Sequence, residues 1–214
     1  MLYPSLSMAE LEQRVTIRHP EHFEQALAKG KGAIIVSAHF GNMDLPSAIM
    51  ANHFKPIALV SETLRPPQLM NYLAKIRGDH HVHMYPYDRA PRKLIEALKR
   101  NEMIAFLLDF GVTHHFDMHT VPVTLFGAET DFPTGPAQMA LLTGASILVG
   151  YTNVDAHGHI DVYTYPPFVP ERTGDRKRDA EIAMQKIAGL MEDFIRKSPE
   201  QWYIFRPMWK DAQT

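Results

Sequence analysis

The sequence contains no cysteine among its 214 residues. Without cysteine the chain has no disulfide framework, no thiolate metal site and no cysteine nucleophile, although the compartment is left open. It also lacks any run of about 18 apolar residues, the length that a membrane-spanning helix requires. No basic segment followed by an apolar one stands at its start, so we expect no signal peptide.

The net charge is small. Lys and Arg number 22 against 24 Asp and Glu, which gives a formal charge of -2. A chain with this balance lacks the strong positive field of a nucleic-acid-binding protein, so we expect no nucleic-acid partner. The hydrophobic fraction of 45% and the charged fraction of 21% are those of a globular protein. Its length predicts a single domain over residues 1–214, with a helical lead-in over residues 1–30.

Short apolar runs alternate with amphipathic segments along the chain. The apolar runs predict buried strands at 33–38, 56–61, 83–87, 103–108, 146–152 and 159–163, with a further strand or edge hairpin at 121–125. The amphipathic segments predict helices at 8–15, 22–29, 66–77, 90–99, 135–142 and 179–197. This order predicts an α/β fold, in which helices flank a central, largely parallel sheet.

The segment HFGNMD follows the first predicted strand directly. It reads as a turn that leads into a helix, with Asn42 as the N-cap and Asp44 in the first turn. Active residues of open α/β sheets gather at the carboxyl ends of strands, so His39 and Asp44 lie where catalytic groups are expected. Gly41 gives the turn the backbone freedom to bring the imidazole toward the carboxylate.

This pair suits one kind of chemistry. A neutral imidazole can take the proton from a hydroxyl group during its attack, and a carboxylate on the other ring nitrogen stabilises the resulting imidazolium. A structural alternative stays open from the pattern alone. In that reading His39 fills a pocket or caps the helix, and Asp44 complements the helix dipole.

Four segments together resemble one family. GAIIVSAHFGNMDL resembles the HxxxxD block of the glycerolipid acyltransferase superfamily, in particular its lipid A late acyltransferase branch, which includes lauroyl, myristoyl and phosphatidylinositol mannoside acyltransferases. The further matches are DFG followed by VPVTLFG, then TGPAQMALLTGASILVG, and finally PEQWYIFRPMW. The resemblance covers residues 30–209, which form the expected family core.

The resemblance implies an O-acyltransferase. Its donor would be acyl-CoA or acyl carrier protein, its acceptor a membrane glycolipid of the lipid A precursor or phosphatidylinositol mannoside type, and it would need no cofactor or metal. His39 is then the general base and Asp44 its orienting partner. The expected substrate-binding residues are Asn42, Arg77, Asp109, Gly135 and Pro136. We expect peripheral association with the inner face of the cytoplasmic membrane.

Some positions depart from the family pattern or keep two interpretations. Leu107 stands where some relatives carry a carboxylate, and Met43 where an aromatic residue is usual. The oxyanion donors are expected either at residues 40–42 or at residues 134–136, and the resemblance favours the second for positioning substrate. Arg77 is either a phosphate ligand or an exposed helix-end arginine, Gly135 is either functional or a packing glycine, and Arg65 and Arg206 are weaker phosphate candidates. For Trp202 and Trp209 we expect a structural role.

Two histidine clusters support an alternative function. They consist of His80, His81 and His83, and of His114, His115, Asp117 and His119. Their spacing is loosely compatible with metal ligands but matches no defined zinc pattern. The alternative is therefore a metal-dependent hydrolase. A third hypothesis is a catalytically silent lipid-binding relative.

Overall fold

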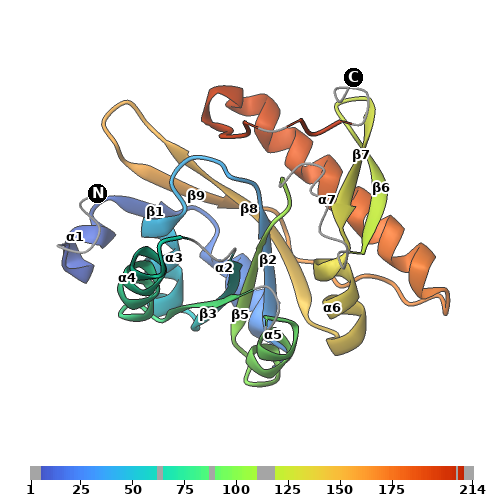
Figure 1. Ribbon diagram of the computed structural model, residues 1–214, viewed down its shortest axis with the longest axis horizontal. Coiled ribbons are helices and arrows are strands. Elements are labelled where there is room, and N and C mark those ends of the chain that lie inside the picture. Colours follow the sequence, from blue (N-terminus) through green and yellow to red (C-terminus); the bar gives the residue numbers. More distant parts are fainter. Residues whose placement is uncertain (1–5, 62–64, 87–89, 110–118, 206, 210–214) are drawn as a thin grey trace.

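The computed structural model describes residues 6–61, 65–86, 90–109, 119–205 and 207–209. Its centre is a seven-stranded sheet with the strand order β1-β9-β8-β2-β5-β3-β4 (Figure 1). The strands of this sheet are β1 (Val15–Ile17), β2 (Ala33–Ser37), β3 (Ile57–Ser61), β4 (Val82–Pro86), β5 (Met103–Leu107), β8 (Ser146–Val154) and β9 (Ile160–Thr164). The helices are α1 (Met8–Glu12), α2 (Pro20–Leu27), α3 (Asp44–His53), α4 (Pro67–Gly78), α5 (Ala90–Lys99), α6 (Gly135–Thr143) and α7 (Arg176–Lys197).

The sheet is parallel at every pairing except that of β8 with β9. A separate antiparallel ribbon consists of β6 (Thr120–Leu125) and β7 (Ala128–Pro133). The predicted α/β class is therefore confirmed, and the predicted segment at 121–125 is one strand of a hairpin.

The prediction was wrong at the first helix, which we expected to reach Val15. The helix ends at Glu12, and Val15 begins strand β1, which pairs with β9 at the edge of the sheet. Three residues are too few to show a period of two, and their partner lies far along the chain. The last helix also begins earlier than expected, at Arg176, where the side chain of Asp175 caps it.

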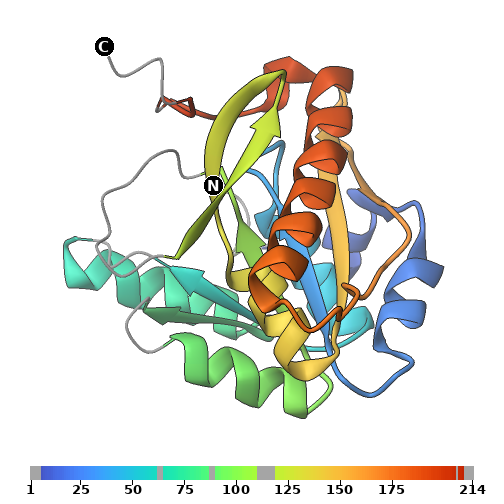
Figure 2. The same cartoon turned by 90° about the vertical axis from the view of Figure 1, so that its right-hand side faces the viewer.

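The two faces of the sheet carry separate cores, because successive side chains of a strand point to opposite faces. In β2, Ile34 and Val36 join the core that includes buried residues of α5, α6, α7 and the β6–β7 ribbon. Ala33 joins the other core, with buried residues of α1, α2, α3 and α4. Figure 2 shows α7 running along one side of the molecule, next to the ribbon. The sheet is thus buried on both faces, as its apolar strands require.

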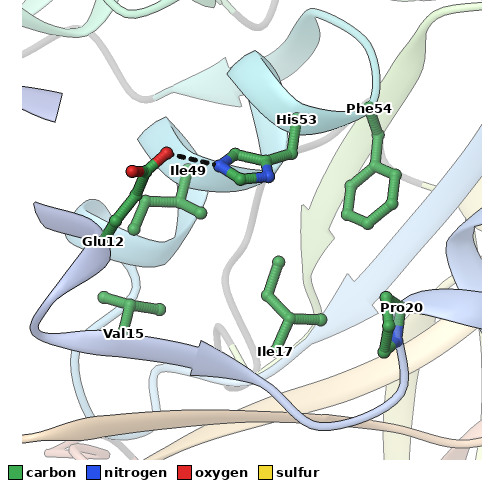
Figure 3. Close-up of a pocket in the computed structure, with 7 residues that line it drawn as sticks. All are labelled: Glu12, Val15, Ile17, Pro20, Ile49, His53 and Phe54. Atoms are coloured by element: carbon green, nitrogen blue, oxygen red, sulfur yellow. Dashed lines mark hydrogen bonds and ion pairs between the residues drawn. The ribbon is translucent and has the colours of Figure 1, made fainter. Parts of the chain in front are cut away.

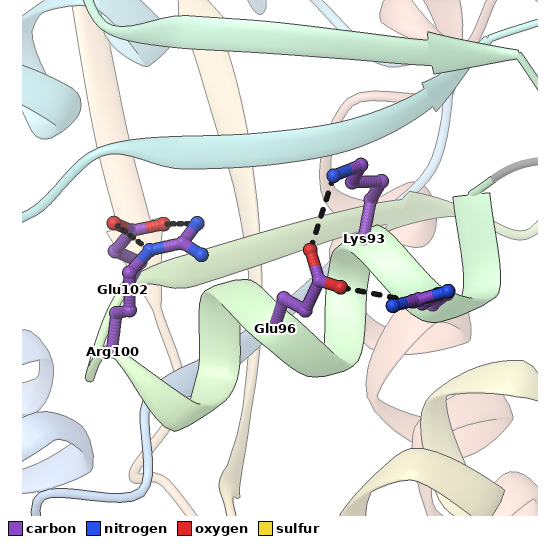
Figure 4. Close-up of polar contacts among 5 residues, drawn as sticks. Lys93, Glu96, Arg100 and Glu102 are labelled. Carbon is purple, nitrogen blue, oxygen red and sulfur yellow. Dashed lines mark hydrogen bonds and ion pairs between the residues drawn. The ribbon is translucent and has the colours of Figure 1, made fainter.

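Helix α5 shows how a helix is divided between core and solvent. Its buried side is formed by Ala90, Leu94, Ala97 and Leu98. On its outer side Lys93 and Arg92 both pair with Glu96, and Arg100 pairs with Glu102 just beyond the helix (Figure 4). Exposed pairs of this kind contribute little to stability, so the apolar stripe is what fixes α5 on the sheet.

Long apolar helices are absent from the ranges described above, in which no helix has the length and hydropathy needed to cross a bilayer.

Candidate active site

The site lies at the carboxyl ends of the neighbouring strands β2 and β5. These strands are parallel, and their register places Ser37 opposite Leu107. His39 and Asp109 each follow two residues later, so the register brings them together. The ladder continues beyond the strands, because the amide of Leu108 donates to the carbonyl oxygen of Ser37 at 3.1 Å.

Asp109 holds His39 through two atoms. The imidazole Nδ1 lies 2.8 Å from Asp109 Oδ1, and the backbone amide of His39 donates to Asp109 Oδ2 at 2.8 Å. Asp109 is 1% exposed, whereas the side chain of His39 is 41% exposed. A buried carboxylate on Nδ1 selects the tautomer in which Nδ1 carries the proton, so the basic lone pair lies on Nε2. The exposed part of the ring can then meet a substrate.

A third donor reaches the same carboxylate. The indole Nε1 of Trp202 donates to Asp109 Oδ2 at 2.9 Å. With the two contacts from His39, both oxygens of this buried side chain have partners, as a buried charge requires. Sequence reasoning assigned Trp202 a structural role and missed this contact, since nothing in the pattern relates residues 109 and 202.

The turn after His39 is shaped by Gly41, whose φ is +60°. A Cβ at this position would overlap the carbonyl oxygen of Thr152 and lie 2.7 Å from its Oγ1. The hydroxyl group of Thr152 donates to the carbonyl oxygen of Phe40 at 2.9 Å. Because the turn fits so closely against β8, only glycine is accommodated at position 41.

Asp44 forms an ion pair with Arg77. It accepts a hydrogen bond from Arg77 Nε at 2.9 Å, and Arg77 Nη2 lies 2.8 Å from the same oxygen. The carboxylate on His39 Nδ1 is that of Asp109, which the sequence analysis placed among the substrate-binding residues. The structure thus brings together His39 with Asp109, and Asp44 with Arg77. A catalytic role for Asp44 stays a prediction.

The remaining expected site residues lie at the starts of helices. Asn42 is not the N-cap of α3, because the helix begins one residue later than expected and Met43 occupies that position. The side-chain oxygen of Asn42 still accepts from the amide of Leu45, at 3.4 Å. Gly135 and the buried Pro136 begin α6.

Gly135 lies close to β5. A Cβ at this position would be 3.2 Å from the Phe106 ring, so the packing interpretation of this glycine has direct support. A role of Asn42, Gly135 or Pro136 in substrate binding stays a prediction. Of the two places proposed for oxyanion donors, the first has one amide already engaged, since Gly41 donates to the carbonyl oxygen of Gln201 at 2.9 Å.

The histidine clusters give no metal site in the described part of the chain. The one group there whose ligand atoms lie within 4.8 Å of one another is His19, Glu21 and His22 at the surface. His80, His81 and His83 therefore do not come together as a ligand set. Of the second cluster, His114, His115 and Asp117 lie outside the described residues, as does Arg206.

A shallow cavity of about 380 Å³ lies elsewhere, beside the edge strand β1 (Figure 3). Apolar side chains of Val15, Ile17, Ile49 and Phe54 line it, together with Glu12 and His53, which lie 2.8 Å apart at Oε1 and Nε2. It includes none of the expected site residues.

Comparison with known proteins gives consistent matches. The model of a family described as bacterial lipid A biosynthesis acyltransferase matches residues 3–211. A phosphatidylinositol mannoside acyltransferase of Mycolicibacterium smegmatis is 25% identical over 211 residues, which cover 96% of this chain and 66% of that protein. One of Mycobacterium tuberculosis is 26% identical over 194 residues, which cover 88% of this chain and 58% of that protein. The chain spans less than two thirds of the length of these relatives.

Proposed function

Because the chain belongs to the family of bacterial lipid A biosynthesis acyltransferases, we propose that it transfers a fatty acyl group from a thioester to a hydroxyl group of a membrane glycolipid. The family membership confirms the resemblance that the motifs indicated. Acyl-CoA or acyl carrier protein is the proposed donor. The names of the relatives favour a phosphatidylinositol mannoside as acceptor, and the family description favours a lipid A precursor.

The observation that carries the proposal is the contact between His39 and the buried Asp109. A sugar hydroxyl is a weak nucleophile at neutral pH, so its attack on the thioester carbonyl needs a base. In the proposed mechanism Nε2 of His39 takes the hydroxyl proton as the C–O bond forms. The tetrahedral intermediate then collapses, the C–S bond breaks, and the imidazolium returns the proton to the departing sulfur. The products are an ester and a free thiol.

Asp109 supports each step through Nδ1. It keeps the imidazole in the tautomer that presents Nε2, and it stabilises the imidazolium between the two proton transfers. For Asp44 the earlier prediction, that it orients His39, remains a proposal, and its ion pair with Arg77 offers a second role. Arg77 is the proposed ligand for phosphate groups of the donor or acceptor, with Asp44 fixing its guanidinium.

Peripheral association with the inner face of the cytoplasmic membrane is part of the proposal. Two exposed aromatic residues support it, Tyr203 and Phe205, the second being 91% exposed. They lie close to the site in the chain's fold, since the amide of Tyr203 donates to the carbonyl oxygen of His39 at 2.8 Å. Exposed apolar side chains next to a catalytic centre suit an enzyme whose acceptor lies in a bilayer.

Thiol release tests the function. Purified protein and a His39→Ala variant are incubated with palmitoyl-CoA, with and without a glycolipid extract, and the free thiol is followed. We expect release that rises with the acceptor and falls about 10²–10⁴-fold in the variant, the range that base catalysis supplies.

A parallel reaction with EDTA addresses the hydrolase alternative. Base catalysis by His39 needs no ion, so the rate should not change. Loss of activity with EDTA, or equal rates for the wild type and His39→Ala, would contradict the proposal. Ester formation on the glycolipid, detected by mass spectrometry, distinguishes transfer from simple hydrolysis of the thioester.

A further inference from the structure

Residues 201–203 run antiparallel to residues 39–41, beside the catalytic turn. The amide of Gly41 donates to the carbonyl oxygen of Gln201 at 2.9 Å, and the amide of Tyr203 donates to that of His39 at 2.8 Å. Phe40 and Trp202 face each other across this bridge. The segment thus holds the backbone of the turn at both His39 and Gly41.

From this geometry we infer that Trp202 is a positioning residue of the catalytic centre. Its indole N–H donates to Asp109 Oδ2 at 2.9 Å, while Oδ1 of the same carboxylate holds His39 Nδ1. The indole therefore sets the rotation of the Asp109 carboxylate about its own axis, and through it the direction of the imidazole. This inference rests on the function proposed above, and it assigns Trp202 no contact with the substrate.

The indole is itself held firmly enough to act in this way. Its ring packs against Phe126 and Trp209, with ring centroids 6.1 and 6.5 Å away. The preceding residue anchors the segment to β8, because Gln201 Oε1 accepts from the amide of Val154 at 2.8 Å. Gln201 Nε2 donates to Asn153 Oδ1 at 2.9 Å as well. The ring contacts and the hydrogen bonds of the neighbouring backbone together fix the orientation of the indole, so its N–H points at Asp109.

The loss of this donor is expected to affect Asp109 specifically. Hydrogen bonds to charged groups are stronger than neutral ones, and a buried acceptor that loses its donor finds no water to replace it. Among the described residues Oδ2 then keeps one donor, the amide of His39, which moves with the turn itself. The Asp109 carboxylate can then rotate together with the turn. The orientation of the imidazole, which depends on this carboxylate, is no longer fixed.

The test compares Trp202→Phe with Trp209→Phe. Each substitution removes one indole N–H from the same aromatic cluster and leaves a ring in its place. Trp209 donates to the carbonyl oxygen of Leu125 at 3.1 Å, not to the catalytic carboxylate. The two variants therefore match in lost packing and differ in the partner of the lost bond.

We expect kcat for thiol release to fall roughly 10- to 100-fold in Trp202→Phe, the effect of one lost bond to a charged group. KM should be unchanged, because a positioning residue makes no contact with the substrate. Trp209→Phe keeps an aromatic ring against the Trp202 indole and leaves the bond to Asp109 intact, so it should retain wild-type kcat. Equal kcat in both variants, or a rise in KM that accounts for the whole effect, would overturn the inference.

A second measurement does not depend on turnover. The Nδ1–H proton of His39 gives a downfield proton NMR signal when it is bonded to a buried carboxylate, and a His39→Gln variant identifies it. We expect this signal to broaden through solvent exchange in Trp202→Phe and to stay sharp in Trp209→Phe. If the wild type transfers no acyl group, the proposed function fails while this comparison still stands. If the signal is alike in both variants, the positioning role fails whatever the activity.

Discussion

At His39 the chemistry depends on which carboxylate holds the imidazole. Asp109 is buried and lies 2.8 Å from Nδ1, while Asp44 pairs with Arg77. A carboxylate stabilises an imidazolium strongly only at short distance, because the electrostatic interaction weakens with distance and with exposure to solvent. The arrangement therefore favours Asp109 as the group that stabilises the imidazolium.

Substitution of each carboxylate by its amide separates the two. In Asp109→Asn we expect kcat to fall about 10²–10⁴-fold, because an amide neither selects the tautomer nor stabilises the imidazolium. In Asp44→Asn we expect a smaller fall in kcat together with a higher KM, through Arg77. Steady-state kinetics on both variants, with thermal unfolding as a check of folding, makes the comparison. A large loss confined to Asp44→Asn would instead support the prediction made from the sequence.

Gly41 gives a second prediction at this scale. An alanine there must adopt a positive φ and overlap the Thr152 carbonyl, so Gly41→Ala should lose both activity and stability. Gly158 is the matched control, since its φ is +81° and no heavy atom lies within 4 Å of an added Cβ. Gly158→Ala should cost about 1–2 kcal/mol from backbone strain alone and keep full activity. Chemical denaturation and thiol release measure both, and equal stability losses would contradict the account.

Among the elements, α7 covers one face of the sheet and leads directly into the segment that carries Trp202. Its first turn is capped by Asp175, whose carboxylate accepts from the amides of Lys177 and Arg178, both at 3.1 Å. Two amides that have no partner within the helix are satisfied in this way. The cap is remote from the site in sequence, so a substitution at Asp175 should change the stability of the protein without changing its activity.

Asp175→Ala should lower the free energy of unfolding by about 1 kcal/mol. For a domain of this size the melting temperature should fall by about 2–4 °C. Asp175→Asn should behave as the wild type, because asparagine caps helices equally well. Calorimetry measures the difference. A loss of activity without a loss of stability would show that α7 acts on the site in some other way.

Most elements follow from the sequence, because apolar runs and amphipathic segments report burial directly. The exceptions have physical reasons. Strand β1 is three residues long, and β7 is a strand only because it pairs with β6. The pairing of His39 with Asp109 follows from the register of β2 with β5, which local patterns do not specify. Asp109 was expected at the site from family resemblance, whereas its partner Trp202 was found only through the fold.

At the scale of the whole molecule, exposed apolar side chains lie near the candidate site, at the edge of the sheet where the parallel strands end. The exposed Tyr203 bonds to the backbone of His39, and the exposed Phe205 follows two residues later. Leu69 and Tyr72 are exposed in the first half of α4, which follows the end of β3. Figure 2 shows α4 and the red segment that directly follows α7 extending toward the left of the view. Leu142 and Ile182 are exposed too. Leu142 stands near the opposite edge, because α6 ends just before β8 begins, and Ile182 lies in the first third of α7.

Liposome sedimentation tests this division. Phe205→Ser and Leu69→Ser should each lower the partition coefficient about tenfold, given the free energy of burying such side chains. Leu142→Ser and Ile182→Ser remove apolar groups of α6 and α7 that are 61% and 57% exposed, and they should leave partitioning unchanged. Equal effects from both pairs would indicate nonspecific adsorption. Wild-type protein that remains wholly in the supernatant would contradict membrane association.

The bridge between residues 201–203 and the turn at His39 has a consequence for the order of assembly. Every strand of the sheet precedes this segment in the chain, so each is translated before it. During synthesis from the N-terminus, β2 and β5 can pair while Asp109 still lacks the indole. The sheet is therefore synthesised before Trp202, the residue inferred to hold the Asp109 carboxylate in place.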